Sequence, residues 1–155
     1  MNLIDRKSNL PAAGSPEKPE TRLRIFNLNR QTKLADSAEV AGHGAARRKG
    51  LLGRDCLPSG AGLWIVPCES VHTFFMKFPI DLVYIDRNKK VKKVRSNVRP
   101  WRMSACLSAH SIIELPAGTV RSTQTAPGDK LEFTPADPQN DATKSASTDF
   151  GASGL

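Results

Sequence analysis

The sequence predicts a small, mainly β domain, an antiparallel barrel or sandwich of about seven or eight short strands with one helix packed on its side. Short segments of alternating apolar and polar residues recur along the chain, separated by Gly, Pro, Asn or Asp. Residues 64–86 are the richest in aromatic and β-branched side chains and include the only Tyr and one of the two Trp. A single stretch has the cap and charge pattern of a helix.

The folded unit is expected to span residues 22–134. The chain has 155 residues and 39% hydrophobic content, and apolar residues are sparse at both ends. Residues 1–21 contain Pro11, Pro16 and Pro19, while residues 135–155 are mostly small and polar. Such segments cannot bury enough apolar surface to offset the entropy of ordering, so both are predicted to be disordered.

The first half of the domain is predicted to form strands around the single helix. Residues 22–28 alternate polar with apolar side chains, as in a half-buried strand, and residues 32–35 are predicted to pair back. Asp36 or Ser37 is a suitable N-cap for a helix over 36–49, with basic residues in its last turn. Gly42 and Gly44 weaken that helix. The apolar run 63–66 predicts a buried strand that ends at Pro67.

The central segment is predicted to be two strands that meet at Pro79. Alternation in a strand over 71–78 would place on one face His72, Phe74, Met76 and Phe78. Pro79 ends this strand, and residues 80–86 begin the next. Asp81 interrupts an apolar run, so its carboxyl group is expected to face inward.

The second half of the domain begins with a predicted hairpin. Residues 86–90 form its turn, in which Asn88 or Lys89 takes a positive φ, so Lys89→Gly is expected to be neutral or stabilising. Residues 91–96 return as the partner strand, and residues 98–106 are irregular. Strands are predicted over 111–115 and 130–133, with a short helical turn after 116–118.

Positive charge is concentrated in the segment 87–102, where no acidic residue occurs. The chain's formal net charge is +8, and the basic residues of this segment are Arg87, Lys89, Lys90, Lys92, Lys93, Arg95, Arg99 and Arg102. The segment is interpreted either as a solvated hairpin edge or as an adaptor surface for anionic partners. Only Trp101 is nearby, and no zinc-finger spacing or Gly-rich phosphate loop occurs, which argues against nucleic acid as the partner.

The chain is expected to be cytoplasmic. No apolar run approaches the ~20 residues needed to cross a bilayer, and the N-terminus has no apolar signal-peptide segment. Three Cys without close pairing fit reduced thiols better than a disulfide framework.

The leading functional hypothesis is a non-enzymatic module that binds a small molecule or a peptide. Its candidate binding residues combine polar groups of the central segment with aromatic walls: His72, Thr73, Met76, Asp81, Trp64 and Trp101. Asp81 also has a structural interpretation, as an acceptor of backbone N–H groups at the bend after Pro79.

A second hypothesis is a metal- or thiol-dependent enzyme. Cys68 and His72 are four residues apart, as are Cys106 and His110, and together they could supply the four ligands of a zinc ion. Four residues of a strand span about 13 Å, so a shared site would need a bend near Cys68. The alternatives are ordinary buried thiols or a Cys68–Cys106 disulfide.

The chain also resembles DUF family 192, an uncharacterised family of small bacterial and archaeal domains. The resemblance covers residues 22–134 and rests on motifs in one order: GLLGR at 50–54, GLW at 62–64, HTFFMKFPID at 72–81, RPWR at 99–102, ELPAG at 114–118 and GD at 128–129. It implies a compact, mostly β domain of unknown biochemical role, in some members behind a secretion signal or lipid anchor. The family has no agreed catalytic residues, and this chain departs from it at 41–46, where relatives carry bulkier side chains.

Overall fold

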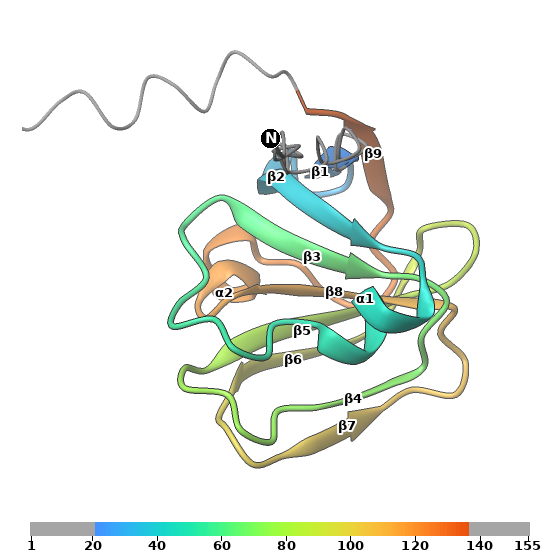
Figure 1. The fold of residues 1–155 in the computed structure, drawn as a ribbon. Helices are drawn as coiled ribbons and strands as arrows, with labels where there is room; N and C mark the ends of the chain where they lie inside the picture. Colours follow the sequence, from blue (N-terminus) through green and yellow to red (C-terminus); the bar gives the residue numbers. More distant parts are fainter. Residues whose placement is uncertain (1–20, 137–155) are drawn as a thin grey trace, which may run out of the picture.

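The computed structural model describes residues 21–136, which form nine strands and two short helices (Figure 1). In chain order these are β1 (Arg22–Asn27), β2 (Thr32–Ala41), α1 (Gly44–Lys49), β3 (Ala61–Ile65), β4 (Ser70–His72), β5 (Ile80–Ile85), β6 (Val91–Val98), β7 (Met103–Ala105), β8 (Ser111–Pro116), α2 (Thr119–Thr123) and β9 (Leu131–Pro135). The predicted disordered ends lie outside the described residues, apart from residues 21, 135 and 136. Both helices of residues 21–136 are too short to span a bilayer.

Seven strands form one curled sheet in the order β6-β5-β8-β3-β2-β1-β9. The β2–β3 pair is parallel and the other neighbours are antiparallel. The two edge strands meet where Lys90 bridges Lys130 and the Val91 N–H donates to the Asp129 carbonyl at 2.8 Å. The predicted small β barrel with a helix is therefore confirmed, although with more strands and a second helix.

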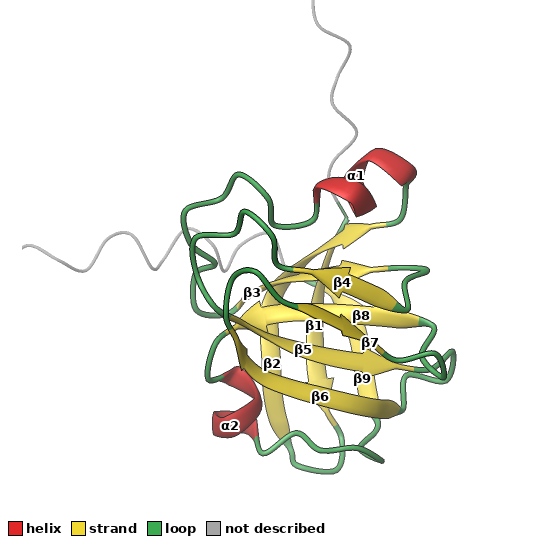
Figure 2. Ribbon diagram, turned by 90° about the horizontal axis from the view of Figure 1, so that it is seen from below, coloured by secondary structure: helices red, strands yellow, loops and turns green. Residues whose placement is uncertain are grey.

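The strands β5 and β8, which both have neighbours on either side, bury apolar side chains on both faces of the sheet. Val83 and Ile113 point into the curl, while Leu82 and Ile112 point to the opposite face. That second face is covered by the separate two-stranded sheet of β4 and β7 and by the segment around α1. Figure 2 shows α1 and α2 at opposite ends of the sheet.

The helix predicted over 36–49 is wrong for most of its length. β2 continues to Ala41, and α1 contains only Gly44–Lys49. The physical reason is pairing with β3: Ala38 is fully buried opposite Gly62, where a Cβ atom would lie 3.4 Å from that of Ala38. Small side chains thus let two strands pack closely, a contact that local helix propensity does not report.

The strand predicted over 71–78 is correct only at its start and wrong from residue 73 onward. β4 ends at His72, and residues 73–79 form a loop in which Phe75 has a φ of 63°. Strand alternation therefore fails, since His72 is exposed whereas Met76 is buried in the core. Residues 98–106, predicted to be irregular, include the short strand β7.

The hairpin between β5 and β6 is confirmed. Lys89 has a φ of 63°, and the Asp86 carboxylate accepts hydrogen bonds from the backbone N–H groups of Asn88 and Lys90. The Lys89 ammonium lies 3.9 Å from the ring centroid of Trp64. This contact gives the Lys89 side chain a role that the sequence did not indicate.

Lys89→Gly is consequently expected to change the free energy of unfolding little. Relief of the positive φ would stabilise the protein by about 0.4–1 kcal/mol, and loss of the contact with Trp64 would offset about 0.5–1 kcal/mol. Gln124→Gly is the matched control, because exposed Gln124 has a φ of 53° at the end of α2. Urea denaturation should show the control to be the more stabilised variant, and equal stabilisation of both would contradict a role for the ammonium.

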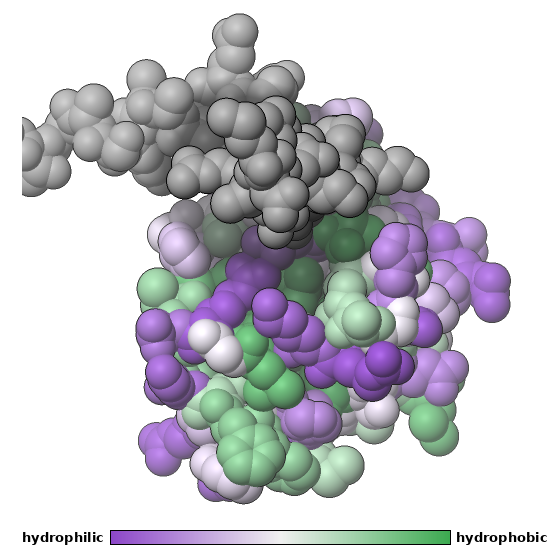
Figure 3. Space-filling view, viewed as in Figure 1, coloured by the Kyte–Doolittle hydropathy of each residue, from purple (hydrophilic) through white to green (hydrophobic). Residues whose placement is uncertain are grey.

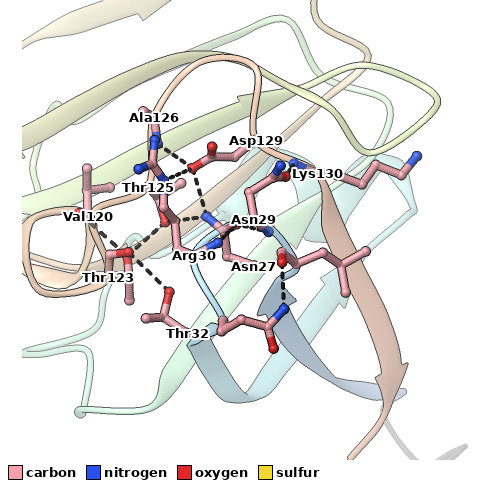
Figure 4. Close-up of polar contacts among 12 residues, drawn as sticks. Asn27, Asn29, Arg30, Thr32, Val120, Thr123, Thr125, Ala126, Asp129 and Lys130 are labelled. Carbon is pink, nitrogen blue, oxygen red and sulfur yellow. Dashed lines mark hydrogen bonds and ion pairs between the residues drawn. The ribbon is translucent and has the colours of Figure 1, made fainter.

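A buried polar network joins the β1–β2 turn to the start of β9 (Figure 4). Asn27 donates to the Thr125 hydroxyl at 3.2 Å and to the Asp129 carboxylate at 2.9 Å. Burial would raise the pKa of Asp129, but hydrogen bonds from Asn27, Ala126 and Arg30 prevail and lower it. Since these groups come from both ends of the domain, the network holds the curled sheet together beside the Lys90–Lys130 bridge.

Candidate functional site

Aromatic and apolar side chains gather on the surface where the loop after β4 meets the loop before β7. We call this set the aromatic surface: His72, Phe74, Phe75, Trp101 and Met103. Phe75 is 72% exposed, Trp101 56% and Met103 70%. Figure 3 shows apolar side chains at the lower end of the molecule, below the main sheet. Exposed apolar groups that cluster in this way mark interaction sites more often than isolated ones do.

The rings of the aromatic surface contact one another. Phe75 meets Trp101 edge to face with ring centroids 4.7 Å apart, and Phe74 lies 5.7 Å from Trp101. His72 stacks on Phe74 at 5.1 Å. These spacings are the ones aromatic pairs favour, so the rings support one another while remaining open to solvent.

Thr73 fixes the two loops that carry these rings. Its buried hydroxyl donates to the Arg99 carbonyl at 2.8 Å and accepts from the Arg102 N–H at 2.9 Å. Its backbone N–H donates to the Arg102 carbonyl, and its carbonyl accepts from the Trp101 N–H at 3.0 Å. The positions of Phe75 and Trp101 are therefore set by hydrogen bonds beneath them.

Both exposed aromatic residues have a strained backbone. Phe75 and Trp101 each have a φ of 63°, a region that bulky residues rarely adopt. Such conformations cost about 1–3 kcal/mol each and concentrate at functional sites. Because both side chains are exposed, core packing does not compensate for their backbone strain. This combination is expected of residues that are kept at the surface for binding.

The structure brings together only some of the predicted ligand-binding residues. His72 and Trp101 belong to the aromatic surface, and Thr73 lies directly beneath it. Met76 is instead buried in the core against the covered face of the sheet. Trp64 packs inside the curl, 4.8 Å from the ring of Phe133.

Asp81 faces inward as predicted, and its partners are backbone groups. One carboxylate oxygen accepts from the Asn97 N–H at 2.7 Å. The other accepts from Gly118 at 3.1 Å and from Val120 at 2.7 Å, at the start of α2. These contacts match the structural interpretation of Asp81, as an anchor for the loops around it.

The residues of the zinc hypothesis are distributed over two regions. Cys68 and His110 line a surface hollow together with Ser70 and Asp86, whereas His72 belongs to the aromatic surface. Within residues 21–136, no group of three or more His, Cys, Asp or Glu side chains is arranged to hold a metal ion. The zinc-enzyme hypothesis therefore remains a prediction without structural support.

The cysteines are free thiols, so Cys68 and Cys106 do not form the disulfide considered as an alternative. Burial raises the pKa of the Cys68 thiol, whose Sγ atom donates to the Ser70 carbonyl at 3.1 Å. A raised pKa reduces the thiolate fraction and hence nucleophilicity near neutral pH.

The basic segment 87–102 divides into engaged and exposed side chains. Lys89 lies over Trp64, and the Lys93 ammonium donates to the Ala105 carbonyl at 2.8 Å. The remaining basic side chains are exposed: Arg87, Lys90, Lys92, Arg95, Arg99 and Arg102. Arg99 and Arg102 flank Trp101, so the aromatic surface has a basic border.

Glu114 is the residue that sequence reasoning missed. Its carboxyl group is buried in the middle of β8, and this burial raises its pKa to about 7, with Arg54 acting in the opposite direction. Its Oε2 atom has no hydrogen-bond partner among the described residues. The available signal was its place in the run Ile112-Ile113-Glu114-Leu115, which is apolar on both sides as in a strand buried on both faces.

The fold makes this chain a small, mainly β domain built on a curled seven-stranded sheet. The chain belongs to the family DUF192, described as "Uncharacterized ACR", whose sequence model matches residues 26–133.

The chain is similar in sequence to archaeal proteins and similar in fold to two solved bacterial structures. A UPF0127 protein of Pyrococcus abyssi is 31% identical over 70% of this chain and 96% of its own length, and one of Pyrococcus horikoshii is 30% identical over 70% and 97%. A Sinorhizobium meliloti protein, described as a putative transcription regulator, has a TM-score of 0.66 at 23% identity over 77% of this chain and 98% of its own. A protein of unknown function from Novosphingobium aromaticivorans has a TM-score of 0.59 at 18% identity, covering 72% and 83%. At these identities the solved structures support the fold alone.

Proposed function

We propose that this domain is a non-enzymatic binding module that docks a peptide segment of a partner protein on the aromatic surface. The observation that carries the proposal is the pair Phe75 and Trp101, exposed, in contact, and each held at a positive φ. Large aromatic anchors with little freedom to rearrange dominate the binding energy of many interfaces. Because the rings lie on open surface and not in an enclosed cavity, a peptide fits this site better than a small molecule does.

The positive charge around the aromatic surface favours a peptide of negative charge. Arg99 and Arg102 are exposed on either side of Trp101, and Lys92 and Arg95 extend the positive charge along β6. Complementary charge steers association and favours one class of partner over another. The peptide is therefore an acidic one that carries an aromatic or aliphatic anchor for Trp101 and Phe75.

Selection from a random peptide library displayed on phage, with the full chain as bait, tests this function. The selected peptides should combine Asp or Glu with Trp, Phe or Leu. A synthetic copy of the most enriched peptide should then bind Trp101→Ala at least about tenfold more weakly than the original chain, as for a central anchor. Titration calorimetry or fluorescence anisotropy gives the dissociation constants.

Leu107→Ala is the matched control, because Leu107 is 85% exposed and lies beyond the opposite end of β7. It should leave the affinity unchanged. Selection of basic peptides, or equal affinity of Trp101→Ala and the original chain, would refute the proposed site.

A further inference from the structure

Residues 44–57 form a cover segment over the face of the sheet that holds Glu114. The helix α1 at its start has no buried residue and no side-chain cap at His43. The rest of the segment is attached by Leu51 and Leu57, which are buried in the core, by Arg54, and by an exposed ion pair between Asp55 and Lys77. Arg54 donates to both carboxylate oxygens of Glu39 on β2, at 3.0 and 2.6 Å. A short helix without buried side chains contributes little to its own stability, so a few contacts hold this segment.

Glu114 lies directly beneath the cover segment. A Cβ atom built at Gly50 would be 3.8 Å from the Oε2 atom of Glu114. Glu114 pairs with Leu63 of β3 on one side and with Leu82 of β5 on the other, and Glu39 follows Leu63 in the same row. The carboxyl group thus sits between two leucines and the backbone of the segment, where an ionised form has poor solvation.

The charged and titratable groups near Glu114 come from several elements packed on this face. The cover segment supplies Arg54 and β2 supplies Glu39, while the connection from β3 to β4 supplies Cys68. On β5 the next residue of the same face is Tyr84, whose buried hydroxyl has no partner at hydrogen-bonding geometry. Arg47 and Lys49 of α1 act on Cys68 and Glu39. Arg54 is therefore the cation placed to respond if Glu114 becomes charged.

We infer that the cover segment is a lid that loosens when Glu114 loses its proton. With the proton in place, the neutral carboxyl is tolerated beneath Gly50 while Arg54 remains on Glu39. Once ionised, the carboxylate is stabilised either by water that enters as the segment lifts, or by Arg54 turning away from Glu39. Both responses weaken the attachment of residues 50–57. This device is independent of peptide binding on the aromatic surface.

Hydrogen exchange measured by mass spectrometry on the full chain tests the lid. The exchange rates of amides 50–57 are compared between the original chain and Glu114→Gln, which keeps the shape of the side chain without its charge. The two proteins should exchange equally at pH 5.5, and at pH 8 the original chain should exchange at least about tenfold faster. Because both proteins are compared at one pH, the intrinsic pH dependence of exchange cancels. Amides 28–31, in the distant β1–β2 turn, should show no difference.

Equal exchange of amides 50–57 in the two proteins at pH 8 would overturn the inference. If the β5 amides nevertheless exchanged at different rates in the two proteins, Glu114 would ionise only when the whole domain unfolds. If Glu114→Gln failed to fold, the pH profile of exchange in the original chain alone would test the lid. After correction for the intrinsic rates, exchange of residues 50–57 should rise through about pH 7, and a flat profile would refute the lid.

Discussion

Asp81→Asn is expected to lower the free energy of unfolding by about 3 kcal/mol or more. The fully buried carboxylate accepts hydrogen bonds from the N–H groups of Asn97, Gly118 and Val120. An asparagine of the same shape has one oxygen, so its amide group must place donor against donor at one of these positions. Losing a hydrogen bond to a charged group costs about 1.5–3 kcal/mol, and leaving a buried N–H unpaired costs about 1–3 kcal/mol.

Urea denaturation at pH 7 measures this loss. Asp55→Asn is the matched control, because the Asp55 side chain is largely exposed and its contact with Lys77 lies at the surface. The free energy of unfolding of this control should equal that of the original chain. An Asp81→Asn variant as stable as the original chain would show that the carboxylate does not anchor the start of α2.

Glu114→Gln is expected to remove a pH dependence of stability. The pKa of Glu114 is raised by burial from 4.5 to about 7 in the folded protein. Below pH 4.5 both folded and unfolded states carry the proton, so the group contributes no pH dependence there. Between pH 4.5 and 7 the unfolded state ionises while the folded state stays neutral, and the folded state loses about 3 kcal/mol of relative stability. Above pH 7 the loss is complete.

The variant should therefore be about as stable as the original chain at pH 4.5 and more stable by up to about 3 kcal/mol at pH 8. Unfolding by urea at half-unit pH intervals would establish both profiles. Glu132→Gln, on the exposed part of β9, controls for the change in net charge. Parallel profiles for the original chain and Glu114→Gln would show that the Glu114 carboxyl is solvated in the folded state.

Part of the candidate site could be predicted from residue types alone. His72, Thr73 and Trp101 were selected because aromatic and polar residues cluster around them in the sequence, and the structure brings these three together. Phe75 was not among the predicted binding residues, because it was expected to lie within a strand of the central segment. Its exposure accompanies a positive φ in the loop after β4, and the hydrogen bonds of Thr73 join this loop to one distant in sequence.

The sequence by itself determined the strands that alternate or are flanked by turn residues, among them β1, β5, β8 and β9, together with the hairpin at Lys89 and the inward carboxylate of Asp81. Strand periodicity and turn chemistry are local properties, so they can be read without knowing what the segment contacts. Only the tertiary structure decided the length of β2, the loop 73–79, the Asn27–Asp129 hydrogen bond and the burial of Glu114 beneath Gly50. Each of these depends on pairing or packing between segments far apart in the chain, and the energy of such contacts outweighs the local preferences that the sequence displays.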